Sequence, residues 1–556
     1  MLVFVFLTFL AGCKKQEYDV VIRGGTVYDG SGKSGIVMDI GINQDTLAFM
    51  GDLSDAVGKK EIDAKGLAVA PGFINMLSWA VESLIIDGNS EADIRQGVTL
   101  EVFGEGSSMG PMNDAMKKET RDQLRRDPET AYEIDWTTLG EYLESMEKRG
   151  IAPNVASFVG ATTVRIHELG YDNRLPNAQE LERMKLLVKK AMEEGALGVG
   201  SSLIYAPANY SSTEELIELC KVASQYGGMY ITHMRNEGNG IFAAVDETIR
   251  IAREGNLPAE IYHLKLAGKD NWWKLDSLIS KINEANKAEL RITTDMYMYL
   301  AGATGLDAAM PPWLQEGGIN QWIKRMKDPK IRKQAIEEMR KPSDQWENLM
   351  MLAGSPDRVL LLSFTNDSLK RFTGKTLAEV SEIYGKSPEE TAMDLVIADS
   401  TRVGAAYFLM NEDNIKRQIA LPFMSFGSDA GSPKASGVFL KFNEHPRAYG
   451  NFARLLGKYV RDEKIIPLEE AIRKLTSLPA SNLKIKKRGS LTTGYFADVS
   501  IFDPAKIQDH ATFQKPHQYS TGMIHVFVNG VQVLSNGEHT GARPGRVVRG
   551  PGWKGK

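Results

Sequence analysis

Three side chains at the ends of predicted strands could act together on one metal ion. His233 follows an apolar segment in YITHMRNE, and His263 follows the next such segment in EIYHLK. Successive strand ends lie side by side in a parallel barrel, so the two imidazoles would converge. Asp429 in FGSDAG lies at a third strand end, where its carboxylate could bind metal or accept a proton, although an Asx turn or helix N-cap would also explain it. These positions predict metal-assisted chemistry.

The elements that must position these residues alternate along the middle of the chain. Short apolar runs end in polar or glycine-rich loops, and helical stretches separate one run from the next. The runs with their loops cover residues 195–205, 227–237, 259–265, 290–299 and 423–431. This order is typical of a parallel sheet with helical crossovers. In a barrel of this kind the polar residues at the carboxyl ends of the strands face one mouth, where active sites are built.

Strand patterns also mark both ends of the chain. Residues 18–30 alternate apolar and polar side chains before a glycine turn, and residues 494–504 and 525–534 show a similar pattern. The last segment contains Asn529-Gly530, a strong signal for a hairpin turn. Two β-rich ends around a long α/β middle predict one small sheet domain built from both termini.

We therefore expect the following division of the chain. Residues 1–17 form a signal peptide and tether, residues 18–70 and 485–556 form the small β-domain, and residues 71–484 form the barrel. The stretch at about 310–352, with PPWLQEGG and several charged helical turns, is expected to be an insertion or lid after one strand.

Composition excludes some classes of protein. The chain has 556 residues, of which 42% are hydrophobic and 25% charged, and this is ordinary for a globular protein. A net charge of −4 offers no basic surface for phosphate backbones, so nucleic-acid binding is not expected.

The N-terminus predicts a lipid anchor. The first residues, MLVFVFLTFLAGCKK, hold an apolar run too short to cross a bilayer core of about 30 Å. The run from Leu10 to Cys13 is similar to a bacterial lipobox, in which the cysteine is acylated and becomes the new N-terminus. Cys13 would then attach the chain to a membrane of the bacterial cell envelope, facing the periplasm or the exterior. A start-site artefact is the alternative, because no cationic segment precedes the apolar run.

A set of motifs in a fixed order carries a family resemblance. From Tyr18 to about Arg549 the chain contains GGTVYDG, APGFI, RQGVT, THMRNE, HLK, GSDAG, HPRAYG and GYFADVSIFDP. In this combination it resembles the D-aminoacylase (N-acyl-D-amino-acid deacylase) family of the amidohydrolase superfamily. The resemblance implies a (β/α)8 barrel with a small β-sandwich domain formed by both chain ends, a divalent metal that is usually zinc, and hydrolysis of the amide bond of N-acyl-D-amino acids.

The resemblance also implies roles for individual residues. They are metal binding by His233 and His263, proton transfer by Asp429, polarisation of the substrate carbonyl by Tyr297 in DMYMY, and binding of the substrate carboxylate by Lys265 in HLK and Arg447 in HPR. The two cations suit an anionic substrate, because a guanidinium offers a carboxylate two parallel hydrogen bonds and an ammonium adds charge.

Two departures from the family pattern concern the metal. Where the superfamily has His-x-His after the first barrel strand, this chain has Leu77 and Trp79, and neither side chain binds metal. Where many relatives have a cysteine ligand, Glu105 is the nearest residue able to take its place; Gly106 is equally close to that position, and Glu101 is a poorer candidate on the strand itself. A carboxylate beside two imidazoles still suits zinc.

The resulting hypothesis is a one-metal hydrolase. Glu105, His233 and His263 would hold one zinc ion, or another divalent metal, and leave a position open for water, whose pKa zinc brings to about 7. Asp429 would accept the proton of this water and pass it to the leaving amine, while Tyr297 would help to hold the oxyanion.

Two alternatives stay open at this stage. The chain could be a catalytically silent lipoprotein that binds an acylated amino acid or peptide; Leu77, Trp79 and Ala161, each in place of a family histidine, favour it, whereas the retained histidines and aspartate speak against it. It could also hydrolyse another amide, such as a dipeptide or a cyclic amide.

Overall fold

A computed structural model describes residues 16–343 and 345–555 of the chain. Its centre is a parallel barrel in which each strand pairs with the next along the chain. The strands are β6 (Phe73–Asn75), β7 (Val98–Phe103), β8 (Asn154–Ser157) continued by β9 (Val159–Gly160), β10 (Gly198–Ser202), β11 (Met229–His233), β12 (Ala259–Ile261), β13 (Ile292–Met296) and β17 (Met424–Phe426). The backbone N–H of Met76 donates to Phe426 at 3.2 Å and joins the first strand to the last. The predicted (β/α)8 barrel is confirmed.

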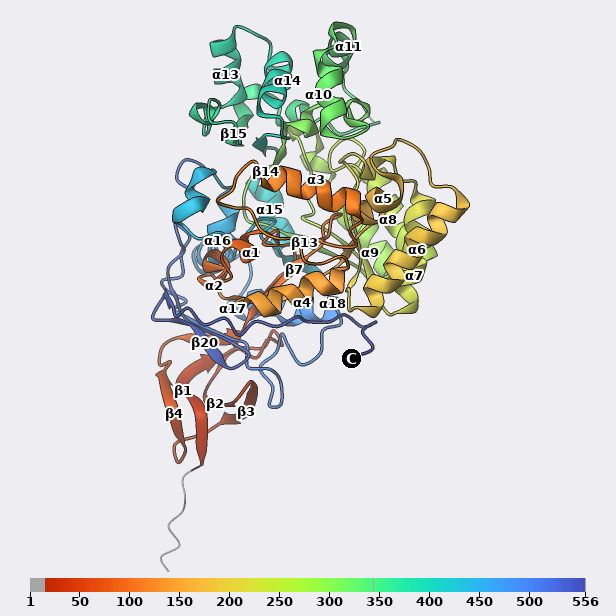
Figure 1. Ribbon diagram of the computed structural model, residues 1–556. Coiled ribbons are helices and arrows are strands. Elements are labelled where there is room, and N and C mark those ends of the chain that lie inside the picture. Colours follow the sequence, from red (N-terminus) through yellow and green to blue (C-terminus); the bar gives the residue numbers. More distant parts are fainter. Residues whose placement is uncertain (1–15, 344, 556) are drawn as a thin grey trace, which may run out of the picture.

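Amphipathic helices cover the outside of the barrel (Figure 1). They include α4 (Leu139–Arg149), α6 (Ala178–Glu193), α7 (Thr213–Gln225), α8 (Ile241–Gly255), α9 (Leu275–Lys287), α15 (Glu412–Ile419) and α17 (Leu468–Leu475). Helix α8 buries Ile241, Val245, Ile249 and Ala252, which recur every three or four residues on one face. The helix ends at Asn256, whose φ of +53° suits a left-handed C-cap. The main hydrophobic core lies between these helices and the strands.

Both chain ends form the small β-domain, at the bottom of Figure 1. Its nine strands are β1 (Glu17–Val27), β2 (Ile36–Asn43), β3 (Thr46–Gly51), β4 (Val57–Asp63), β5 (Ala68–Pro71), β18 (Val499–Phe502), β19 (Met523–Val528), β20 (Val531–Ser535) and β21 (Glu538–His539). Strand β18 pairs antiparallel with β5 and thereby joins the two ends. Ile22, Ile40, Val499 and Phe527 share one buried core. The prediction of a β-domain from both termini, with its hairpin at Asn529, is confirmed.

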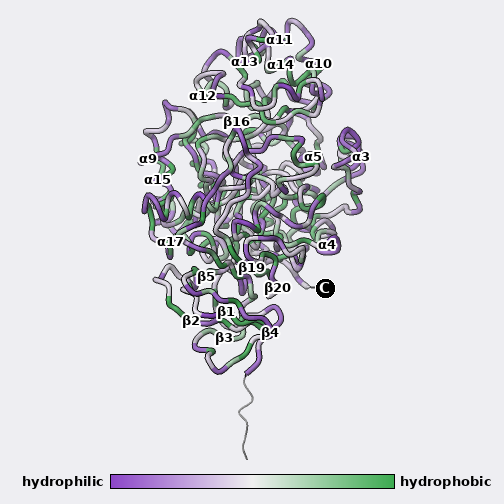
Figure 2. The backbone as a smooth tube through the Cα atoms, turned by 90° about the vertical axis from the view of Figure 1, so that its left-hand side faces the viewer, coloured by the Kyte–Doolittle hydropathy of each residue, from purple (hydrophilic) through white to green (hydrophobic). Residues whose placement is uncertain are grey.

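A separate lobe covers the mouth of the barrel, at the top of Figures 1 and 2. Its sheet consists of β14 (Ala301–Gly305), β16 (Gly404–Phe408) and β15 (Val359–Ser363), and its helices include α10 (Ile319–Lys327), α11 (Pro329–Met339), α13 (Leu377–Tyr384) and α14 (Pro388–Asp399). The lobe is inserted between β13 and β17 of the barrel. The insertion expected at about 310–352 lies within it.

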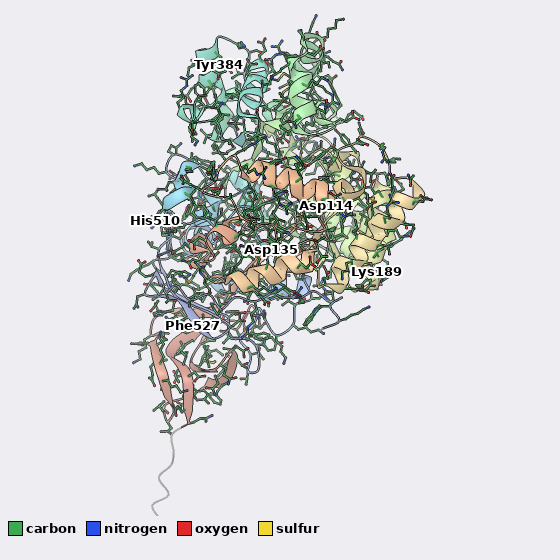
Figure 3. All side chains as sticks on the ribbon, in the orientation of Figure 1. Asp114, Asp135, Lys189, Tyr384, His510 and Phe527 are labelled. Atoms are coloured by element: carbon green, nitrogen blue, oxygen red, sulfur yellow. The ribbon has the colours of Figure 1, made fainter. Side chains whose placement is uncertain are left out.

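Side chains fill the space between the ribbons (Figure 3). Within the described part of the chain, no helix combines the length and the apolar character that crossing a membrane requires. Cys13 and the lipobox lie outside the described residues, so lipidation and a location in the cell envelope stay predictions.

Candidate metal-dependent active site

A carboxylate and two imidazoles meet at the mouth of the barrel. One oxygen of Glu105, Oε1, lies 2.9 Å from His233 Nδ1 and 3.0 Å from His263 Nε2. The three side chains are buried, and their candidate ligand atoms lie within 4.8 Å of one another. No other group of three or more histidine, cysteine, aspartate or glutamate side chains in the described part of the chain brings its ligand atoms this close together. Two nitrogens and one oxygen in this arrangement are a donor set that zinc accepts, so the residues fit the expected metal.

Unusual backbone conformations position Glu105, His263 and Asp429 at the mouth of the barrel. Glu105 lies between two glycines after β7, and a Cβ on Gly106 would come within 2.5 Å of the Cβ of Ser202, so that only glycine fits this turn. His263 has a φ of +36° and Asp429 a φ of +50°, values that non-glycine residues rarely adopt. Strained backbone of this kind concentrates at functional sites. The carboxylate of Asp295 fixes the His263 turn by accepting its N–H at 2.8 Å.

Electrostatics favour an ionised carboxylate at the centre of the group. Burial raises the pKa of Glu105, but hydrogen bonds with His233 and His263 outweigh it and hold that pKa well below its usual range. Burial and the nearby Lys265 lower the pKa of His263, but Glu237 and Glu105 outweigh them and raise it to about 10. Without metal, the protonated imidazole of His263 therefore balances the negative charge of the neighbouring carboxylates. A histidine that binds metal must lose this proton, so a bound cation would supply the balancing positive charge in its place.

Glu237 belongs to the site, although the sequence did not single it out. Its Oε1 lies 2.6 Å from Lys265 Nζ and 3.0 Å from His263 Nδ1. Lys265, which the resemblance assigned to the substrate carboxylate, lies in the site, but its ammonium is already bound by Glu237 and lies 2.7 Å from His263 Nδ1. The one sequence signal for Glu237 is its position four residues after His233 in THMRNE.

Asp429 and Arg447 form a buried ion pair beside this group. Arg447 Nη1 lies 2.8 Å from Asp429 Oδ2. Burial raises the pKa of Asp429, and Arg447 partly offsets this effect, so the carboxyl group is poised to exchange a proton. Arg447 Nε has no hydrogen-bond partner in the structure and remains available to a ligand.

The ring of Tyr297 lies near both Lys265 and Arg447, and its hydroxyl group makes no hydrogen bond in the structure. The ring packs under Arg447 at 4.4 Å from its guanidinium carbon, and the buried hydroxyl has no hydrogen-bond partner. Burial raises the pKa of Tyr297 to about 12, so the hydroxyl keeps its proton at neutral pH and can donate it to a ligand. His445, which the sequence also did not single out, accepts the backbone N–H of Arg447 at 3.0 Å and thereby positions that residue.

The structure also places the residues that depart from the family pattern. Glu101 is fully buried and is not part of the candidate metal-binding group; its carboxyl group lies 2.5 Å from the Ser78 hydroxyl and 2.7 Å from the Ser90 hydroxyl. Glu105 alone of the three candidates joins the histidines. Trp79 lines the cavity, and its indole Nε1 donates to Glu105 Oε2 at 2.9 Å.

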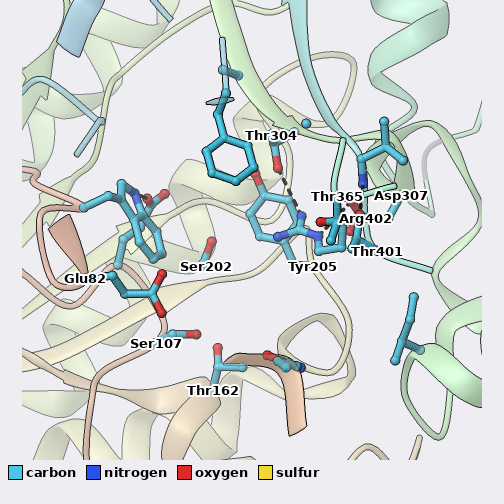
Figure 4. A pocket seen from close by; sticks show the side chains of 18 of the residues that line it. Glu82, Ser107, Thr162, Ser202, Tyr205, Thr304, Asp307, Thr365, Thr401 and Arg402 are labelled. Atoms are coloured by element: carbon cyan, nitrogen blue, oxygen red, sulfur yellow. Dashed lines mark hydrogen bonds and ion pairs between the residues drawn. The ribbon is translucent and has the colours of Figure 1, made fainter. Parts of the chain in front are cut away.

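A cavity of about 1230 Å³ contains all seven predicted residues: Glu105, His233, His263, Lys265, Tyr297, Asp429 and Arg447. Hydroxyl groups also line this cavity, among them Ser107, Thr162, Ser202, Thr304, Thr365 and Thr401 (Figure 4). Arg402 reaches into it from the lobe, where it donates to Asp307 at 2.9 Å and to Thr304 at 3.1 Å. The barrel thus supplies the reactive groups, and the lobe supplies one polar wall.

Known proteins share this architecture. Residues 60–534 match the model of the amidohydrolase family. The D-aminoacylase of Alcaligenes xylosoxydans xylosoxydans is 34% identical over 96% of this chain and 98% of that protein. The chain belongs to the amidohydrolase family, in its D-aminoacylase group. The N-acyl-D-aspartate deacylase of the same organism is 31% identical over 96% of this amidohydrolase and 95% of its own length.

Solved structures agree with this assignment. A crystal structure of D-aminoacylase matches with a TM-score of 0.80 and 32% identity, and covers 96% of this chain and 100% of that one. The N-acyl-D-glutamate deacylase of Bordetella bronchiseptica, solved with zinc and a phosphonate inhibitor, matches with a TM-score of 0.79 and 26% identity over 96% of this chain and 100% of that one. The predicted family and the predicted class of enzyme, an amidohydrolase, are confirmed.

Proposed function

We propose that this amidohydrolase cleaves the amide bond of N-acyl-D-amino acids and releases a carboxylate and a D-amino acid, with a single zinc ion bound by Glu105, His233 and His263. The observation that carries the proposal is the convergence of this buried donor set with the Asp429–Arg447 pair in one cavity. Relatives over nearly the full length are a D-aminoacylase and an N-acyl-D-aspartate deacylase, which support the substrate class.

The roles of the side chains follow from their chemistry. Zinc bound here would act as a Lewis acid and bring the pKa of a bound water to about 7. Asp429 takes the proton of the attacking water, because burial raises its pKa and makes it a stronger base than an exposed carboxylate, and then passes the proton to the leaving amine. The Tyr297 hydroxyl donates to the carbonyl oxygen as negative charge develops on it.

Substrate orientation falls mainly to Arg447. Its guanidinium can bind the free carboxylate of the substrate through two hydrogen bonds, while Lys265, held by Glu237, adds positive charge nearby. The substrate carboxylate thereby competes with Asp429 for the guanidinium and frees Asp429 for proton transfer. Binding the substrate would in this way prepare the base.

One metal is sufficient for this scheme. No metal-binding side chain stands at Leu77 or Trp79, the positions where the resemblance expects the ligands of a further ion. A solved D-aminoacylase is described as having a binuclear centre with one-metal activation and second-metal attenuation, which supports catalysis by one ion in this group of enzymes.

The test is hydrolysis by the purified chain loaded with one equivalent of zinc. We expect it to release acetate from N-acetyl-D-amino acids and to leave the L-isomers intact, and we expect His263→Ala to abolish both zinc binding and activity. His510→Ala is the matched control, because His510 is exposed and contacts Thr521 away from the cavity. Inactivity of the zinc-loaded protein on a broad panel of N-acetyl-D-amino acids would overturn the proposal.

A further inference from the structure

Among the described residues, Trp79 supplies the one side-chain hydrogen bond to Oε2 of Glu105, the carboxylate oxygen that does not face the two histidines. The indole Nε1 donates to Oε2 at 2.9 Å, whereas Oε1 faces both imidazoles. An indole nitrogen is a donor only, so it cannot itself bind the metal. The two oxygens of Glu105 thus have separate partners, one facing the metal-binding nitrogens and the other facing the indole.

The backbone of the same segment holds the proton-transfer residue. The N–H of Asp429 donates to the carbonyl of Leu77 at 2.8 Å, and the N–H of Trp79 donates to the carbonyl of Ala430 at 2.9 Å. These bonds continue the pairing of β6 with β17 beyond the ends of the strands and support the left-handed turn at Asp429. Residues 77–79 therefore contact both parts of the site, the metal-binding group and the base.

We propose that Trp79 is a positioning residue for the metal ligand Glu105, an inference that rests on the metal site of the proposed function. Its N–H donates to Oε2, which would keep the carboxylate in one orientation and leave Oε1 as the oxygen that would hold the ion. Partners that hold the outer atoms of metal ligands typically contribute 10- to 100-fold in metal affinity. The segment that lacks the family's first metal ligands thus stabilises the site that remains.

The position of the Trp79 indole makes it possible to distinguish its hydrogen bond to Glu105 from a packing role in the core. Trp79 is 39% exposed and lines the cavity, so the structure does not depend on it as a core residue. Replacing the indole by a phenyl ring keeps an aromatic surface but removes the N–H. Loss of the hydrogen bond therefore changes zinc affinity, whereas loss of ring contact with a substrate changes KM.

The experiment measures zinc affinity of the full chain by competition with a chromophoric chelator, without substrate. Trp79→Phe is expected to weaken zinc binding 10- to 100-fold, and the matched control Trp273→Phe, whose exposed indole contacts only the backbone of Asp270 among the described partners, is expected to leave it unchanged. Thermal unfolding of the zinc-free proteins establishes that both variants fold. Equal affinity of Trp79→Phe and wild type would overturn the inference.

A second measurement uses only the wild-type protein. X-ray absorption at the zinc edge is expected to show a carboxylate bound through one oxygen, and a carboxylate bound through both oxygens would overturn the inference. Failure of the wild type to bind zinc would instead overturn the proposed metal site. The two failures are therefore distinguishable.

Discussion

Substitution of Glu260 by glutamine should make the barrel more stable at neutral pH. Glu260 lies fully buried on β12, where Oε2 accepts from Thr293 at 2.7 Å and from Asn482 at 3.2 Å, and Oε1 accepts from Ser425 at 3.3 Å. All of these donors are neutral. Burial raises the pKa of Glu260 from its usual 4.5 to about 7, because the hydrogen bonds offset only part of the cost of burying the charge.

The sign of the pH dependence follows from proton binding. Between pH 4.5 and pH 7 the folded chain keeps the proton of Glu260 and the unfolded chain has lost it, so the free energy of unfolding falls as pH rises through this range. The full cost is reached above pH 7 and amounts to about 3 kcal/mol, at 1.36 kcal/mol for each pH unit. Glutamine has no proton to lose, and Ser425 can accept from its amide because the serine hydroxyl can donate to Thr294.

Urea unfolding of the zinc-free wild type and Glu260→Gln at pH 5 and pH 8 tests this reasoning. The variant should be more stable by about 1 kcal/mol at pH 5, where the loss has only begun, and by about 3 kcal/mol at pH 8. Glu129→Gln is the control, since Glu129 is exposed. A stability difference that does not change between the two pH values would refute the explanation.

Two further predictions concern catalysis. Tyr297→Phe should lower kcat about 100- to 1,000-fold and leave KM and zinc content nearly unchanged, because one donor to the developing oxyanion is lost. Steady-state kinetics with N-acetyl-D-amino acids measures this effect. An unchanged kcat would exclude Tyr297 from the reaction. Arg447→Lys should raise KM about 10- to 100-fold, since a hydrogen bond between charged groups contributes roughly 1.5–3 kcal/mol and lysine cannot bind a carboxylate with two parallel bonds. Unaltered KM in that variant would assign the substrate carboxylate to another cation.

The sequence predicted much of this architecture because its signals are local. Apolar runs followed by polar residues predicted the strands that carry His233, His263 and Asp429, and parallel pairing alone brings neighbouring strand ends together. The hairpin at Asn529 was predicted because asparagine and glycine accept the positive φ values of +48° and +78° that the turn requires.

Other features depend on tertiary contacts that have no local signal. Glu237 reaches Lys265 across two neighbouring loops, and His445 supports Arg447 through a backbone hydrogen bond. In the lobe, β14 pairs with β16 and not with β15, the strand that follows it in the chain, so periodicity indicated helices but not the sheet. The contact from Trp79 to Glu105 joins residues 26 positions apart through side chains alone.

Charge balance gives a separate reason for a single ion. Glu105, Glu237 and Asp429 carry three negative charges, and Lys265 and Arg447 reduce this to one. One divalent ion with neutral imidazoles then leaves the site positive by one charge, which the carboxylate of an N-acyl amino acid cancels. A second divalent ion would add two uncompensated charges to a buried site, where an unpaired charge is costly, and the segment that could have offered further ligands holds an indole donor instead. The absence of His-x-His and the presence of a carboxylate at position 105 therefore both agree with the single metal ion that we propose.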